Sequence, residues 1–106
     1  MSRVQRQTKI AARSRQGIKK HCSGLQISME DFFNEALKRL IDSYSEPHSS
    51  PIPILAVPRG TSILDVRYQQ AYHDEICRLA DEKNVPLSAI LYSAIHNLSV
   101  TEGIFE

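Results

Sequence analysis

The first half of the chain shows two successive helical patterns of unequal length. Ile18 and Cys22 share one face of the first pattern, which Gly24 interrupts. Ser28 can cap the next helix, and the two acidic residues after it suit the positive first turn. The apolar positions of that helix recur at spacings of three and four, at Phe32, Phe33, Ala36, Leu37, Leu40 and Ile41. The pattern predicts a helix from residue 28 to about Tyr44 with one wide apolar face.

The second half opens on an alternating segment instead. Residues 63–68 read Ile-Leu-Asp-Val-Arg-Tyr, which predicts a strand buried on one face only. A helical pattern follows, with Tyr72, Ile76, Leu79 and Ala80 on one face. Residues 84–86, Asn-Val-Pro, then turn the chain. A second amphipathic helix is expected from the positions of Leu87, Ile90, Leu91, Ala94, Ile95 and Leu98.

A segment rich in proline and serine, residues 45–62, separates the halves. It holds four of the five prolines, so no helix is expected to cross it. Its apolar residues predict an extended strap lying on the body, and they are Ile52, Ile54, Leu55 and Val57. We therefore expect a first unit with a basic N-terminus at 1–44, a linker at 45–62, and a second unit with a short tail at 63–106.

The two halves match each other when 58 is added to the residue number. A unit this small cannot bury its own apolar face, so two units would be needed side by side. One pair disagrees, because His21 falls on Leu79. The agreeing apolar pairs are Ile18 and Ile76, Cys22 and Ala80, Ile27 and Val85, Phe32 and Ile90, Phe33 and Leu91, Ala36 and Ala94, Leu37 and Ile95, and Leu40 and Leu98.

Charge is divided unevenly along the chain. The formal net charge is +1, but residues 1–29 carry +7 without any acidic residue, and residues 30–106 carry −6. Such a division favours a polyanionic partner on the basic side. The alternative is a solvated basic segment without a partner.

The succession of strand, short helix, turn and second helix over residues 63–98 resembles the ribbon-helix-helix family of the MetJ and Arc type. The resemblance rests on the runs 64–68, 79–82 and 90–92 together with Ile76. It implies that strands from two units pair antiparallel and enter the major groove of DNA. It also implies that outward side chains of the ribbon read base edges, and that the first turn of the second helix binds phosphate.

Family members are usually homodimers, whereas this chain is similar to the fused pairs of TraY-type relaxosome proteins. The expected fold is mainly α with a two-stranded antiparallel β ribbon, in which two units with four helices form a pseudo-dimer. The repeat places the first strand at 5–10 and turns Arg6 and Thr8 towards the helices, where the family prefers apolar groups. The register of this strand stays open, because a slip of one residue would exchange its two faces.

The outward positions of the ribbon are the candidates for base contact. Gln5, Gln7 and Lys9 alternate along the first strand, and glutamine suits adenine while lysine suits guanine. Arg67 suits guanine, and Asp65 can accept from cytosine. Different side chains on the two strands predict an asymmetric site. The alternative interpretation is that these are simply solvent-facing strand residues.

The candidates for phosphate contact flank the ribbon. Two are cationic side chains, and the others are backbone amides at the starts of the second helices, as the resemblance implies. They are Arg3, Arg13, Ser28, Met29, Leu87 and Ser88.

Enzyme and metal chemistry find little support in this sequence. It has no glycine-rich phosphate loop and no spacing typical of a catalytic triad, so we expect no enzyme and no cofactor. His73 and Cys77 lie four residues apart, but no Cys-x-x-Cys accompanies them, so we expect no metal. Two cysteines and the lack of a long apolar run favour a cytoplasmic protein with no membrane partner.

The sequence thus predicts sequence-specific binding of double-stranded DNA, as a transcriptional repressor or a plasmid relaxosome accessory factor. A second copy of the chain on an adjacent site is a further candidate partner. An antitoxin role ranks lower, because only the tail 99–106, with Val100, Ile104 and Phe105, is left to wrap a toxin. The alternative is a protein-interaction module that dimerises through its C-terminal half and docks its basic N-terminus on an acidic partner. This alternative includes a partner of the antitoxin type, that is, a toxin that the chain would bind.

Overall fold

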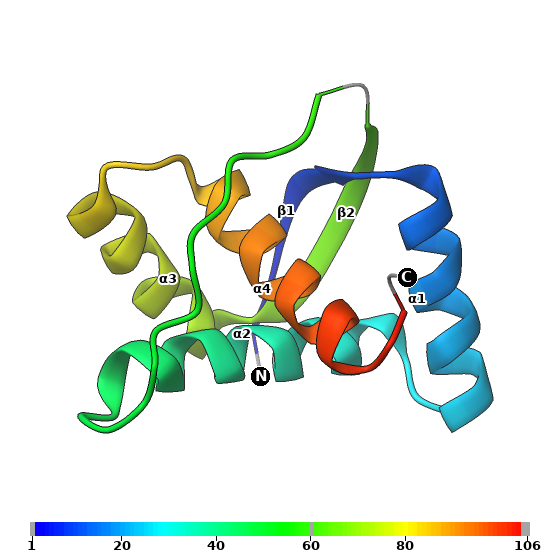
Figure 1. The fold of residues 1–106 in the computed structure, drawn as a ribbon, viewed down its shortest axis with the longest axis horizontal. Coiled ribbons are helices and arrows are strands. Elements are labelled where there is room, and N and C mark those ends of the chain that lie inside the picture. The colour runs from blue at the N-terminus through cyan, green and yellow to red at the C-terminus, as the bar shows by residue number, and fades with distance from the viewer. Residues whose placement is uncertain (1, 60, 105–106) are drawn as a thin grey trace.

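The structure, a computed structural model, describes residues 2–59 and 61–104, and this part of the chain contains two strands and four helices (Figure 1). The fold is therefore mainly helical with a two-stranded antiparallel sheet, as predicted. No helix in the described part is long and apolar enough to cross a membrane. The elements are β1 (Arg3–Ile10), α1 (Ala12–Leu25), α2 (Met29–Ser45), β2 (Ser62–Gln69), α3 (Gln70–Lys83) and α4 (Leu87–Thr101).

The register of the ribbon places the polar residues of both strands on one face. β1 and β2 pair antiparallel from Arg3 opposite Gln69 to Ile10 opposite Ser62. The inner face packs against the helices, and its buried members are Val4, Thr8, Ile10, Leu64, Val66 and Tyr68. The outer face is exposed along Gln5, Gln7, Lys9, Ile63, Asp65 and Arg67. The alternation that the sequence predicts for each strand is therefore present in the ribbon.

Two polar residues occupy inward positions of β1 without disturbing this register. Thr8 is 2% exposed, and its hydroxyl donates to the carbonyl of Ser88 at 2.7 Å, so its burial leaves no unpaired group. Arg6 stays exposed and donates from Nη1 to the carbonyl of Gln5 at 2.8 Å. The long aliphatic stem of an arginine lets its charged head reach solvent even from an inward position.

The halves share local geometry at an offset of 58 residues. α1 and α3 each have 14 residues, and they start and end 58 positions apart. Each is followed by a left-handed residue, Gln26 at φ 58° and Asn84 at φ 54°. The caps of the second helices differ, because Ser28 forms a capping box with Asp31 whereas Pro86 has no side-chain cap.

One hydrophobic core joins the two halves. Phe33 from the first half and Leu91 from the second half belong to the same buried cluster. Ribbon and helices both contribute to it, since Val66 and Tyr68 of the ribbon and Leu40 of α2 are all fully buried in this cluster. Both halves therefore contribute side chains to the same core.

The segment between α2 and β2 forms a strap, whose described residues are 46–59 and 61, and residues 46–59 lie along α4 over the core (Figure 1). Ile52 and Ile54 pack against the core. The amide of Leu55 donates to the hydroxyl of buried Ser93 at 2.7 Å, and the Tyr44 hydroxyl donates to the carbonyl of Ile52 at 2.6 Å. The segment is shorter than the predicted 45–62, because helical and strand pairing extend one residue further at each end.

The described part of the tail folds back on α1 instead of extending from the body (Figure 1). A Cβ on Gly17 would lie 2.8 Å from Cγ2 of Ile104, so the glycine permits this close approach. Val100 stays exposed at the end of α4. Phe105, which the sequence singles out in the tail, lies outside the described residues.

Candidate nucleic-acid interface

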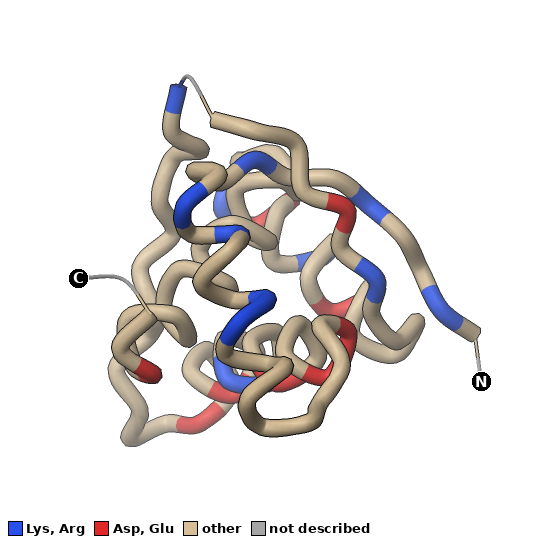
Figure 2. Tube along the Cα trace, turned by 90° about the vertical axis from the view of Figure 1, so that its right-hand side faces the viewer, with Lys and Arg blue, Asp and Glu red and all other residues tan. Residues whose placement is uncertain are grey.

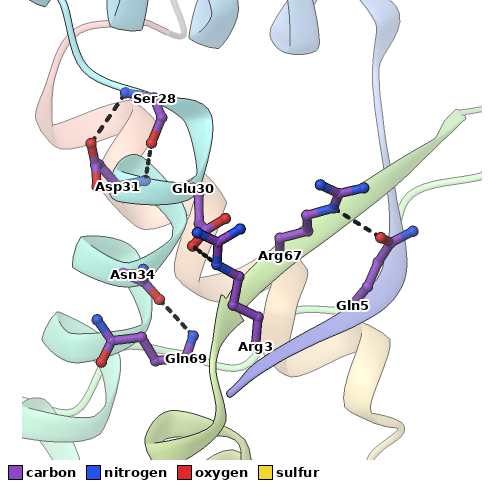
Figure 3. A network of polar contacts seen from close by, with 8 residues as sticks. All are labelled: Arg3, Gln5, Ser28, Glu30, Asp31, Asn34, Arg67 and Gln69. Atoms are coloured by element: carbon purple, nitrogen blue, oxygen red, sulfur yellow. Dashed lines mark hydrogen bonds and ion pairs between the residues drawn. The ribbon is translucent and has the colours of Figure 1, made fainter. Parts of the chain in front are cut away.

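The outer face of the ribbon brings together all five candidates for base contact. Gln5 lies opposite Arg67, Gln7 opposite Asp65, and Lys9 opposite Ile63. Nε of Arg67 donates to Oε1 of Gln5 at 2.9 Å, and Nε2 of Gln7 donates to Oδ1 of Asp65 at 3.0 Å (Figure 3 shows the first pair). These bonds between exposed groups orient the side chains and can be exchanged for bonds to a ligand at modest net cost.

The pair of Gln7 and Asp65 marks the middle of the ribbon. The two residues are directly paired, and they are also equivalent at the offset of 58. An amide thus lies beside a carboxylate at the centre. The centre of the face therefore offers both hydrogen-bond donors and acceptors, and it also carries one negative charge. A two-stranded ribbon has the width that the major groove admits, about 12 Å.

The cations around the ribbon differ in whether a carboxylate neutralises them. Nε of Arg3 lies 3.2 Å from Oε2 of Glu30 in an ion pair (Figure 3). The basic residues of α1 are exposed and form no ion pair within the described ranges, and they are Arg13, Arg15, Lys19 and Lys20. Figure 2, which faces α1, shows basic positions along that helix and the ribbon, with most acidic positions lower in the view. Arg15, Lys19 and Lys20 are not among the contacts predicted from the sequence, although their positive charge is visible in it.

The amides at the starts of α2 and α4 are not equally available. The amide of Ser28 donates to Oδ2 of Asp31 at 3.2 Å, so the capping box occupies this predicted phosphate contact (Figure 3). The amide of Met29 has no acceptor among the described residues, and neither do those of Leu87 and Ser88. The α4 terminus also lacks an acidic residue in its first turn, unlike α2.

The histidine and cysteine that prompted the zinc question do lie in contact. Sγ of Cys77 is 3.4 Å from Nε2 of His73, and Nδ1 of His73 lies 2.8 Å from the Tyr68 hydroxyl in a hydrogen bond. Burial raises the pKa of Tyr68 to about 12, and it also raises the pKa of the Cys77 thiol. No group of three potential metal ligands gathers anywhere within residues 2–59 and 61–104. Tyr68, His73 and Cys77 thus form one cluster of polar contacts beside the buried face of the ribbon.

Comparisons with protein-family models, with curated proteins and with solved structures found no match for this chain.

Proposed function

We propose that the chain is a tandem ribbon-helix-helix protein that binds double-stranded DNA sequence-specifically through the outer face of its ribbon. The observation that supports this most is the pairing of β1 with β2 in a register that puts Gln5, Gln7, Lys9, Asp65 and Arg67 on one exposed face. The shared core and the offset of 58 between α1 and α3 favour two fused units over one larger irregular fold.

In this proposal, sequence is read by side chains whose chemistry differs between the two strands. Gln5 and Gln7 suit adenine, Arg67 and Lys9 suit guanine, and Asp65 suits cytosine. Because equivalent positions carry different residues, the preferred site is asymmetric even though the fold repeats.

Phosphate contacts hold the protein on the duplex without reading sequence. Arg13 is the stronger of the two predicted cations, since Arg3 is already paired with Glu30. The amides of Met29, Leu87 and Ser88 are the available backbone donors. We expect no catalytic step and no cofactor in this function, which serves repression or relaxosome assembly.

The rival function, an interaction module that dimerises through the C-terminal half, needs a surface other than the ribbon. β2 is already paired with β1 of the same chain, and its inner face is already buried. The antitoxin version needs the tail to be free, whereas Ile104 packs against α1 at Gly17. These observations favour the DNA-binding proposal.

The test measures binding of fluorescent duplexes by anisotropy, first with random DNA and then with a selected site. Gln7→Ala and Arg67→Ala should each cost about 1–3 kcal/mol on the selected site and little on random DNA. Arg13→Ala should weaken both duplexes and lower the salt slope by about one unit. Lys38→Ala, an exposed cation on α2, is the control. Absence of binding at micromolar protein and low salt would refute the proposal.

A second copy on an adjacent site is the further partner that we propose, because equivalent helices carry opposite charge at opposite ends of the molecule (Figure 1). α1 has four cations and no acid. α3 carries the cations Arg78 and Lys83 and the acids Asp74, Glu75, Asp81 and Glu82. Head-to-tail contact between α1 and the α3 of a neighbour would make binding to two adjacent sites cooperative.

The control for this contact is a single-site duplex, whose affinity sets the baseline. Lys20→Glu should remove the cooperativity between two sites, and Glu82→Lys in the same chain should restore it. Equal cooperativity in all three proteins would contradict the contact.

A further inference from the structure

The end of the strap lies against one end of the ribbon, and the two border a hollow of about 490 Å³ that is open to the surface. Lys9 and Ile63 line it from the ribbon, Val57, Pro58 and Arg59 from the strap, and Ser88 from the first turn of α4. Two cations from segments far apart in the sequence therefore face the same space. None of the acidic residues that the structure describes lines it.

The corresponding hollow on the other side of the ribbon has a different charge. It is lined by Arg15 and Arg67, but also by the carboxylates of Glu30 and Asp65. Glu30 occupies there the position that Ser88 occupies in the first hollow, since the two residues are 58 apart. Of the strap's described residues, none lines this second hollow. The charges that line the α4-side hollow therefore favour an anion. The charges that line the α2-side hollow roughly cancel, so an anion gains little there.

Arg59 is presented by a segment that the body holds in place. Ile54 packs against the core, and the Leu55 amide is bound to Ser93 four residues before Arg59. On the other side, the hydroxyl of Thr61 donates to the carbonyl of Pro58 at 2.8 Å. Within the described ranges Arg59 forms no ion pair, although its side chain is exposed. A cation held close to a docking face without a carboxylate partner suits an anion from outside the chain.

We propose that Arg59 binds a backbone phosphate of the DNA, so that the strap is part of the DNA-binding surface as well as the connection between the two halves. This inference rests on the proposed function. Arg59 and Lys9 then make the α4 side of the ribbon the more strongly held half. The chain has one strap, so an asymmetric duplex site is bound in one orientation, with the additional phosphate contact on one flank only.

The consequence for binding is a sequence-independent contribution. Each phosphate neutralised by a cation releases condensed counterions and adds about 0.9 to the salt slope on duplex DNA. An arginine also binds a phosphate through two parallel N–H groups, which a lysine cannot reproduce. Arg59 therefore contributes to affinity on every sequence and to orientation on the selected site.

The experiment uses the full chain and one selected duplex. Binding is measured by anisotropy at several salt concentrations, and phosphate contacts are mapped by ethylation interference. Arg59→Ala should weaken binding by several-fold to about tenfold and lower the salt slope by about one unit. Arg59→Lys should keep the slope and recover part of the affinity. Arg59 is exposed, so thermal melts should show that both variants are folded like the wild type.

The matched variant is Arg15→Ala, which removes a cation from the other hollow. Interference at a flanking phosphate should disappear on one side of the site for Arg59→Ala and not on that side for Arg15→Ala. If the wild type binds DNA and Arg59→Ala has the same slope and the same interference pattern, the strap contact is wrong and the proposed function stands. If the wild type binds no duplex, both fail.

Discussion

Leu91 lies at 0% exposure in the core that both halves share, which makes it the most direct probe of whether they fold as one unit. Leu91→Ala removes buried atoms that the neighbouring side chains can replace only in part. Such changes cost about 3–5 kcal/mol in the free energy of unfolding. For 106 residues, an unfolding entropy of about 0.22 kcal/mol per kelvin converts this to a fall of about 14–23 °C in Tm.

The assay that distinguishes one folding unit from two is native-state hydrogen exchange. Leu40 lies on α2 in the first half and is fully buried. If unfolding is cooperative across the chain, Leu91→Ala should accelerate exchange of the Leu40 amide by about 140- to 4,000-fold, the same free energy expressed as a rate ratio. Leu25→Ala, at a side chain that is 58% exposed, should change the free energy of unfolding by less than about 0.5 kcal/mol, so the Leu40 amide should exchange at nearly its wild-type rate.

The result that would refute this reasoning is selective loss of protection. Suppose that amides of α4 exchange faster in Leu91→Ala while the Leu40 amide keeps its wild-type rate. The halves would then unfold separately, and the shared core would not bind them into one cooperative unit. A fragment 1–48 that melts cooperatively by itself would lead to the same conclusion.

Three further predictions follow from single contacts. Asp65→Asn removes the negative charge at the ribbon centre and keeps a partner for Gln7, so affinity for random duplexes should rise by up to about tenfold at low salt. An unchanged anisotropy curve on random DNA would argue against the ribbon as the docking face. The pKa of Tyr68 is raised to about 12, so stability should fall as pH rises above about 10, and denaturant titrations should show a smaller fall for Tyr68→Phe. Gly17→Ala should fail to stabilise the wild type, because the new Cβ would meet Ile104. In an Ile104→Ala background the same change should raise the free energy of unfolding by about 1 kcal/mol in thermal melts, because alanine favours a helix more than glycine does.

Much of the local structure could be predicted because it depends on neighbours in the chain. The helix expected from residue 28 to about Tyr44 is α2, and the strand expected at 63–68 lies within β2. Burial on one face imposes a period of two on a strand and about 3.6 on a helix, and both periods are visible in single residues. The exposed positions of the ribbon follow from the same alternation.

The candidate site could be predicted only in part, because several of its contacts join distant residues. No local pattern indicates that Arg3 pairs with Glu30, or that Thr8 is tolerated inside because the Ser88 carbonyl accepts its proton. Arg59 gave no signal at all, since it lies in a proline-rich segment with no period to interpret.

The sequence by itself determined where the helices and strands lie, which of their faces are apolar, and that basic charge is concentrated before residue 30, since these properties belong to short stretches of chain. The tertiary structure alone decided the pairing of Gln7 with Asp65 and the arrival of Arg59 beside Lys9. Such contacts depend on which distant segments meet. The packing of the whole core determines this, because each apolar face must be buried against a partner that local periodicity does not identify.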